Sequence, residues 1–357
     1  MNNEKRSIVK RYPILHDERG ATAVTVGVML VMLLSMGAMS IDIGHSLVAR
    51  NELQNVSDAA ALAGARELGL IYEGLPPFQQ YGYQLTDPTP VHNAVQTIAA
   101  QNQAAGVSIA VDTADIQIGQ WNDAAQTFTV TNTFPNAVRV TSRRDATTNG
   151  PVSTFLANVM GISSVSVNSF ATAALTFISQ TVPGELDVPF AISSQWFTNF
   201  GCNQPIRFHP TGSPVGCAGW HTFLDSPSNA NQLRNIIDGL NDGSYTSPAT
   251  TAGATSLEFI GGNVASAFPN LINLFNAKKP QGDPSVWEVF VPVYQDTSCA
   301  NPSGPMMIVG YATANITDVQ GPPTMTIDGI VTCNSVQGGQ GGGANFGTFA
   351  SIPGLVQ

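Results

Sequence analysis

The sequence predicts an α+β protein, in which a single N-terminal transmembrane helix continues into a stem helix and antiparallel-sheet α+β domains follow outside the cytoplasm. Three observations lead to this fold class. Residues 20–41 carry no charged side chain. Downstream, segments with the alternation of strands are interleaved with segments of helical periodicity. Charged residues make up only 11% of the chain, against about 25% in typical soluble proteins, and 34 glycines and 23 prolines indicate a turn-rich extracytoplasmic protein.

The first element is the uncharged run at residues 20–41. As a helix it would be about 33 Å long at 1.5 Å per residue, enough to cross a hydrocarbon core of about 30 Å. A buried core helix and a cleavable secretory signal are the two alternatives. Core helices rarely stay uncharged over this length, and a signal has a shorter apolar region. The run therefore predicts a retained membrane anchor.

Basic residues set the predicted orientation of this anchor. Those before the run are Lys5, Arg6, Lys10, Arg11 and Arg19. The segment after the run has mixed charge. Because Lys and Arg accumulate on the cytoplasmic side of membrane helices, we expect the N-terminus in the cytoplasm and the rest of the chain outside.

Beyond the membrane, the helix is expected to continue as an alanine-rich stem. Leu53, Val56, Ala60 and Ala63 recur at spacings of three and four, which places small apolar side chains on one helical face. Small side chains let another segment approach closely. We therefore predict a helix-packing face, directed at a partner helix or at the chain's own globular part. The alternative is that the alanines reflect helix propensity alone.

The predicted organisation is a basic cytoplasmic leader, a transmembrane helix with its stem, an α+β membrane-proximal domain, a disulfide-braced mainly-β domain and a Gly-rich tail. The boundaries are residues 1–19, 20–72, 73–180, 181–336 and 337–357. The boundary near 180 follows from a change to sequence rich in Pro, Gly, Asn, Ser and aromatic residues. The glycine run at 337–343 predicts a flexible tail.

Helices and strands mix within both predicted domains. Helices are expected at residues 90–105, 152–160, about 228–240 and 263–276. Strands are expected at 115–121, 127–132, 137–143, 164–177, 187–192, 287–294, 306–314 and 325–332. This mixture indicates an α+β architecture with antiparallel sheets.

Four cysteines lie on the predicted outer side: Cys202, Cys217, Cys299 and Cys333. Four cysteines allow three pairings, and sequence alone does not choose among them. We expect Cys202 with Cys217 and Cys299 with Cys333, because each pair links neighbouring segments. On the chain-entropy model these disulfides would contribute about 3 and about 4 kcal/mol. Buried free thiols are the alternative.

The sequence lacks the established motifs for catalysis, cofactor binding or metal binding. The net charge of −10 argues against a nucleic-acid partner. His209 and His221 interleave with two cysteines, but their spacing is unlike that of structural zinc sites. There is no nucleophile elbow, H-E-x-x-H or P-loop. We predict a protein that is not an enzyme; a cluster of His209, His221 and Asp225 would instead favour a membrane-tethered periplasmic enzyme.

Short motifs follow one another through residues 19–65. They are Arg19-Gly20-Ala21-Thr22-Ala23-Val24, then the apolar run, then Ser40-Ile41-Asp42-Ile43-Gly44, then Leu53-Gln54-Asn55-Val56-Ser57-Asp58 and the alanine run that ends at Ala65. In this order they resemble the N-terminal signature of TadE/TadG-like Flp pilus-assembly proteins. A weaker similarity in patterning extends to about residue 178.

The resemblance implies a role in pilus assembly, anchoring or surface attachment, with other Tad/Flp pilus-assembly proteins as partners. The implied location is the inner membrane, with periplasmic or surface-exposed domains. A minor pilin, cleaved after Gly20 and incorporated in the filament, is the rival within the same system. Processed pilins usually carry Glu at the fifth position after the cut, whereas this chain has Thr25, which favours an uncleaved anchor.

Overall fold

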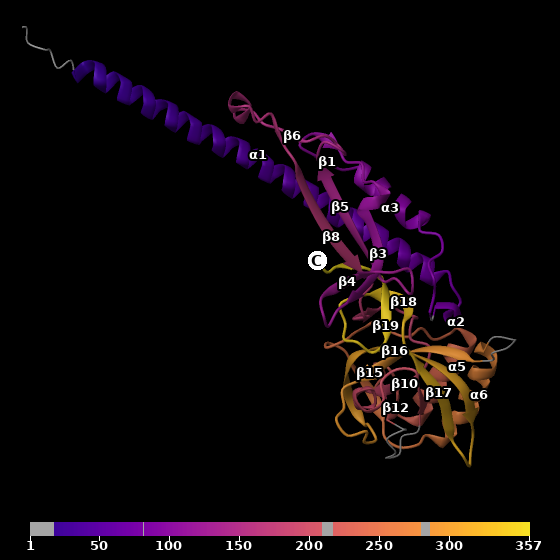
Figure 1. Cartoon of the computed structure of the whole chain (residues 1–357). Helices are drawn as coiled ribbons and strands as arrows, with labels where there is room; N and C mark the ends of the chain where they lie inside the picture. The colour runs from indigo at the N-terminus through magenta and orange to yellow at the C-terminus, as the bar shows by residue number, and fades with distance from the viewer. Residues whose placement is uncertain (1–17, 81, 209–216, 280–285) are drawn as a thin grey trace, which may run out of the picture.

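One long helix, α1 (Glu18–Glu73), organises the computed structural model. The structure describes residues 18–80, 82–208, 217–279 and 286–357. The N-terminal half of α1 projects away from the strands, and the C-terminal half lies against them (Figure 1). No proline interrupts residues 18–73, so the anchor and stem segments form one continuous helix. The basic leader before residue 18 lies outside the described residues.

The C-terminal half of α1 packs on an antiparallel sheet, the proximal sheet, with strand order β20-β8-β5-β3-β4. Its strands are β3 (Ile116–Asn122), β4 (Thr127–Val130), β5 (Ala137–Arg144), β8 (Val167–Ala174) and β20 (Gly354–Leu355). Smaller elements nearby are α2 (Pro77–Gln80), β1 (Gln103–Ala104), β2 (Val107–Ser108) and η1 (Thr113–Asp115). Helix α3 (Thr89–Ala100) packs beside α1, and Leu53, Val95 and Val138 belong to the shared core.

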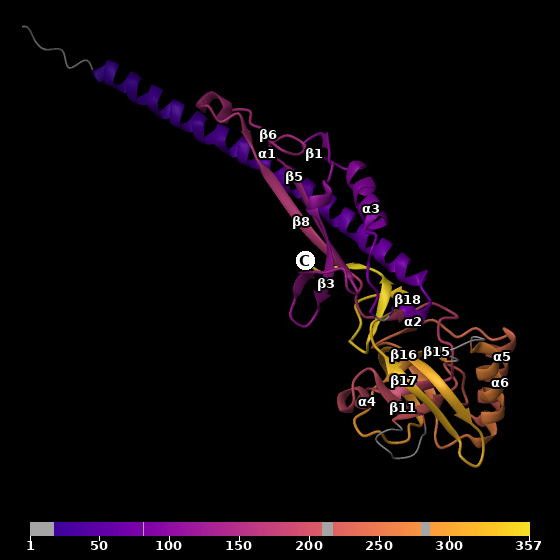
Figure 2. The ribbon, with the colours of Figure 1, turned by 45° about the vertical axis from the view of Figure 1, so that its right-hand side comes forward.

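The segment between β5 and β8 corrects one prediction. The helix expected at 152–160 is wrong: the chain forms β6 (Val152–Ser153), a single 3-10 turn η2 (Ala157–Met160) and β7 (Ser164–Val165), and β6 pairs with β7. The turn ends after four residues because Gly161 adopts a left-handed conformation with φ of 87°. This hairpin lies alongside α1 in both views (Figure 1 and Figure 2).

Farther from the helix lies a second sheet, the distal sheet, with order β11-β17-β16-β14-β12-β10-β15. Its strands are β10 (Phe190–Ser193), β11 (Gln204–Arg207), β12 (Ala218–His221), β14 (Ser256–Ile260), β15 (Trp287–Tyr294), β16 (Gly304–Gln320) and β17 (Thr326–Thr332). Strand β15 also pairs with β16, which closes part of the sheet into a ring. The accompanying helices are α4 (Ser194–Asn199), α5 (Ala230–Asp242), η4 (Ala265–Ala267) and α6 (Phe268–Lys278).

The C-terminal segment connects the two sheets. It forms β18 (Ser335–Gln340) and β19 (Thr348–Ile352), which extend a small sheet with β9 (Gln180–Thr181) and β13 (Thr250–Thr251). Residues 337–340 of the glycine run, which was expected to form a flexible tail, thus belong to strand β18. Glycine is needed there for close approach, because a Cβ at Gly343 would overlap the carbonyl oxygen of Ile178.

The cysteine pairing also differs from the sequential one expected, which is wrong. Cys202 bonds to Cys333, and Cys217 bonds to Cys299. The reason is strand pairing: β11 follows Cys202 and runs antiparallel to β17, which ends just before Cys333. The two Cα atoms of that pair are 5.4 Å apart. Partners distant in sequence are thus brought together at one end of the sheet.

Candidate functional site at the junction of helix and folded region

Helix α1 has two halves with opposite surroundings. Its large apolar side chains from Val24 to Val48 are each 50–70% exposed. Over this part the helix is long and apolar enough to cross a membrane, and none of the most apolar window is buried. From Ala49 onward, one face is buried against the proximal sheet and α3. Figure 2 shows the strands and α3 beside the C-terminal half of α1, while the start of the helix extends away from them.

The four residues proposed as a helix-packing face lie at this junction. Leu53, Val56 and Ala60 are at most 1% exposed and belong to the chain's own core, whereas Ala63 is half-buried. Of the two possible partners, the face contacts the chain's own folded region. Gly69 continues this close packing, since a Cβ there would overlap the carbonyl oxygen of Ser351 in β19.

The polar signature residues after the anchor attach α1 to strand β8. Gln54 donates through Nε2 to Oδ1 of Asp58 (2.7 Å) and to the carbonyl oxygen of Phe170 (3.2 Å). Ser169 donates its hydroxyl to Oε1 of Gln54. The Ser57 hydroxyl donates to the Ser169 carbonyl (3.2 Å). These bonds satisfy polar groups of the helix–sheet interface and fix the register between α1 and β8.

Asp42 holds the β6–β7 hairpin against α1. Its carboxylate accepts the N–H of Phe155 on Oδ1 (2.7 Å) and the N–H groups of Leu156 (3.0 Å) and Ala157 (2.5 Å) on Oδ2. The residue is only 6% exposed. These donors are the first N–H group of turn η2, at Ala157, and the two N–H groups just before it, which have no partner within the turn. The acidic residue at the end of the apolar run therefore caps a segment more than 100 positions away.

The remaining signature residues make fewer contacts. Arg19 and Gly20 lie in the first turn of α1. Around Gly44, no described atom lies within 4 Å of the position that a Cβ would occupy, apart from the glycine itself, its two chain neighbours and the adjacent helix backbone. No intramolecular packing in the described part of the chain explains why glycine stands there.

The histidine and aspartate considered for an enzyme site do not meet. His221 is fully buried beside Phe223 and Phe259, its Nδ1 accepts the N–H of Phe223 (3.1 Å), and burial lowers its pKa to about 3. Asp225 instead accepts hydrogen bonds from Gln232 and Tyr245. His209 lies outside the described residues. Within the ranges that the structure describes, no group of His, Cys, Asp or Glu is arranged to hold a metal ion.

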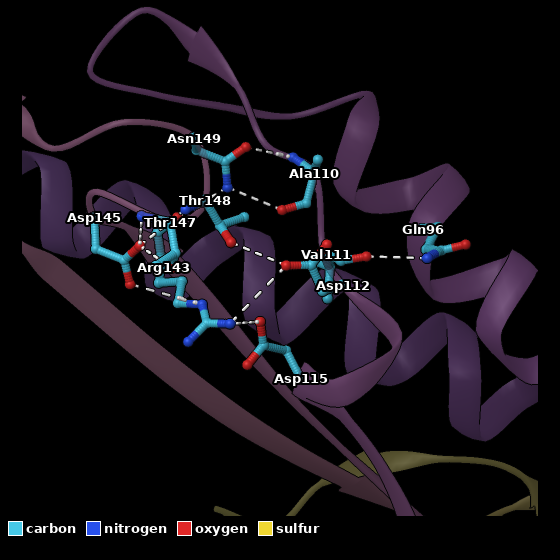
Figure 3. Close-up of polar contacts among 10 residues, drawn as sticks. All are labelled: Gln96, Ala110, Val111, Asp112, Asp115, Arg143, Asp145, Thr147, Thr148 and Asn149. Carbon is cyan, nitrogen blue, oxygen red and sulfur yellow. Dashed lines mark hydrogen bonds and ion pairs between the residues drawn. The ribbon is translucent and has the colours of Figure 1, made fainter.

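An ion-pair network in the helix-proximal region was not foreseen from sequence (Figure 3). The Arg143 guanidinium lies 2.8 Å from Asp115, 3.7 Å from Asp145 and 3.9 Å from Asp112. Partial burial raises the pKa of Asp115, against the opposing effect of Arg143. Asn149 adds a hydrogen bond to the carbonyl oxygen of Ala110 (2.9 Å). The network ties the turn at 145–149 to the segment at 110–115.

A second unforeseen feature is a cleft of about 310 Å³ between the end of α1 and the distal sheet. Glu73, Asp187 and Glu288 contribute carboxyl groups to its lining. Burial raises the pKa of Glu288 to about 7 and that of Asp187 to about 6. Gln337 donates to Oε1 of Glu288 (2.9 Å). The cleft thus concentrates acidic groups where the two parts of the molecule meet.

Two segments of the chain match models of known protein families. Residues 20–67 match the model for TadE/G-like Flp pilus-assembly proteins, and residues 79–173 match the model for Tad-like Flp pilus-assembly proteins. Together they define a Tad-like region. No curated protein and no solved structure matches the chain. The Tad-like region contains the junction around Asp42, the Gln54–Asp58 contacts and the Arg143 network, and the two matches support a role in Flp/Tad pilus assembly.

Proposed function

We propose that the chain is a membrane-anchored component of the Flp/Tad pilus-assembly system that acts through protein–protein contacts. One observation carries this proposal: a single continuous helix is apolar and exposed over its first half and is built into the Tad-like region over its second half. An apolar surface of this length is stable in a bilayer and costly in water. The rigid helix would hold the folded region at a fixed distance from the membrane.

We place the anchor in the inner membrane, with the N-terminus in the cytoplasm and the folded region in the periplasm or at the surface. The excess of Lys and Arg before residue 20 supports this orientation. The two disulfides support it independently, because disulfides persist in oxidising compartments outside the cytoplasm.

Complementation of host cells that lack the protein tests the role. The wild-type chain should restore surface filaments. Leu33→Arg combined with Leu34→Arg, in the middle of the apolar half, should prevent insertion and leave the cells without filaments. Leu224→Arg is the control, because Leu224 is also exposed but lies in the distal part of the chain. Normal filaments with the double variant would contradict the proposal.

A minor pilin remains the second candidate, because an exposed apolar half-helix could also pack among other helices inside a filament. N-terminal sequencing of the membrane and sheared-filament fractions separates the two. A mature start at Ala21 in filaments would replace the anchored component by a filament subunit. An intact leader in the membrane fraction is the result we expect.

A further inference from the structure

The tip of the β6–β7 hairpin exposes a group of apolar side chains, at residues 155–162, which we call the apolar loop. Val159 is 87% exposed, Phe155 63%, Met160 61% and Ile162 52%. No charged residue occurs anywhere between Asp145 and Glu185. Contiguous apolar surface of this kind marks an interaction site on a folded protein.

The apolar loop lies against the part of α1 that leaves the predicted membrane span. Asp42 accepts the three N–H groups that begin the loop. The rings of His45 and Phe155 are 5.1 Å apart. Ala38 is half-buried, while its neighbours on α1 are exposed. The loop therefore contacts α1 at Asp42 and His45.

This position coincides with the end of the hydrocarbon region. A span that begins near Thr22 reaches about 30 Å at residue 41. The described side chains of α1 show no exposed charge before Arg50, because Asp42 is buried under the loop. The apolar surfaces of helix and loop are thus continuous, at the level where one leaflet ends.

The backbone of the apolar loop is suited to an apolar environment. Besides the donors bound by Asp42, the N–H groups of Val159, Gly161 and Ile162 donate to carbonyls within the loop, and Thr154 donates to Ser163. Segments that enter lipid must satisfy their polar backbone groups internally. Asp42 supplies the acceptor that the short turn lacks.

We propose that the apolar loop inserts into the leaflet on the side of the folded region and forms a second membrane contact beside the transmembrane helix. The inference rests on the proposed membrane anchorage. A helix alone leaves the folded region free to rotate about the helix axis. With the loop embedded, the end of the proximal sheet where β5 stops and β8 begins faces the bilayer, and the opposite end of these strands faces away.

The test uses the full chain in vesicles of phosphatidylethanolamine and phosphatidylglycerol. All four native cysteines are paired, so a single introduced cysteine can carry an environment-sensitive fluorophore. The loop site is Val159→Cys. The control is Val130→Cys, an exposed valine on β4, and the anchor reference is Val31→Cys. We expect blue-shifted emission and quenching by spin-labelled lipid at positions 159 and 31, and quenching by aqueous iodide at position 130.

Each other outcome has a distinct meaning. Quenching of position 159 by iodide would overturn the loop proposal while leaving the anchor intact. Protection of position 159 from both quenchers would overturn it in favour of a protein contact. Failure of lipid to quench position 31 would instead overturn the proposed membrane anchorage itself.

Discussion

Gly69 determines how closely α1 approaches strand β19. A Cβ at this position would overlap the carbonyl oxygen of Ser351, a backbone atom that cannot move without shifting the strand. We expect Gly69→Ala to lower the free energy of unfolding by about 1–3 kcal/mol through overpacking, although alanine favours a helix by about 1 kcal/mol. Urea unfolding of the detergent-solubilised chain, followed by tryptophan fluorescence, measures the change.

Gly44→Ala in the same helix is the matched control. Beyond its own chain neighbours and the local helix backbone, no atom of the described residues lies within 4 Å of its Cβ position, so the propensity gain should appear without a packing cost. Equal effects of the two substitutions would show that the contact with Ser351 does not limit packing.

For single residues, the sequence predicts the kind of role, such as packing, more often than it predicts the residue that is contacted. The spacing of Leu53, Val56 and Ala60 identifies a packing face, because helical periodicity is local. The sequence leaves open whether a separate protein or the chain's own sheet covers that face. Asp42 is recognisable by resemblance, but its partners at Phe155 and Ala157 become neighbours only when the hairpin folds back on α1.

Elements with strong local patterns were predicted well. The strand expected at 287–294 is β15 to the residue, and the strand expected at 137–143 is β5 with one residue added. The helix prediction for residues 152–160 was wrong because the apolar residues of this segment form an exposed surface and not the core-facing stripe of a helix. Helix α5 begins at Ala230, two residues after the expected start near 228, since Asn229 caps it by accepting two backbone N–H groups.

The Arg143 network makes a prediction about two connecting segments. Replacing Arg143 by Met removes the cation that three carboxylates share and leaves Asp115, with a side chain only 12% exposed, without its ion pair. We expect a loss of about 1–3 kcal/mol in unfolding free energy. Hydrogen exchange should also rise in the segments 110–115 and 145–149, which the network joins.

Arg207→Met is the control for this effect. Among the residues that the structure describes, Arg207 pairs with Asp328 alone, and its side chain is 55% exposed. An exposed pair contributes about 0–1 kcal/mol, so the loss should be smaller. If both substitutions lower the free energy of unfolding by the same amount, partial burial does not make the Arg143 network more stabilising than an exposed ion pair.

At the scale of the whole molecule, the order of strands in the sheets could not be predicted, because it depends on pairing between segments that are distant in the sequence. Local patterns reveal strands but not which strands pair, and the ring in the distal sheet depends on β15 pairing with both β10 and β16. The disulfides follow from the same pairing. Strand β20 likewise returns from the end of the chain to join β8 in the Tad-like region, which places residues near 354 beside residues near 174.

The acidic cleft between the two parts predicts how stability changes with pH. Burial raises the pKa of Glu288 to about 7, so protonation is favoured in the folded state. The protonated Glu288 carboxyl therefore stabilises the folded state. This stabilisation is complete below the pKa of Glu288 in the unfolded chain, near 4, and is lost as pH rises through about 7. Asp187 acts in the same direction. Desolvation in the cleft raises the pKa of its carboxyl to about 6, although the residue as a whole is exposed, so water reduces its contribution.

We therefore expect the distal part to unfold at a lower temperature at pH 8 than at pH 5.5. Glu288→Gln should reduce the difference in unfolding free energy between these two pH values by about 1–3 kcal/mol. Thermal unfolding followed by near-ultraviolet circular dichroism measures both, since Trp196, Trp220 and Trp287 are buried there. Asp318→Asn, an exposed carboxyl in β16, controls for net charge and should leave the slope unchanged. A wild-type chain that gains stability between pH 5.5 and 8 would contradict the assigned direction. In that case the cleft carboxylates would be stabilised as charged groups, and the contact between α1 and the distal sheet would strengthen on deprotonation.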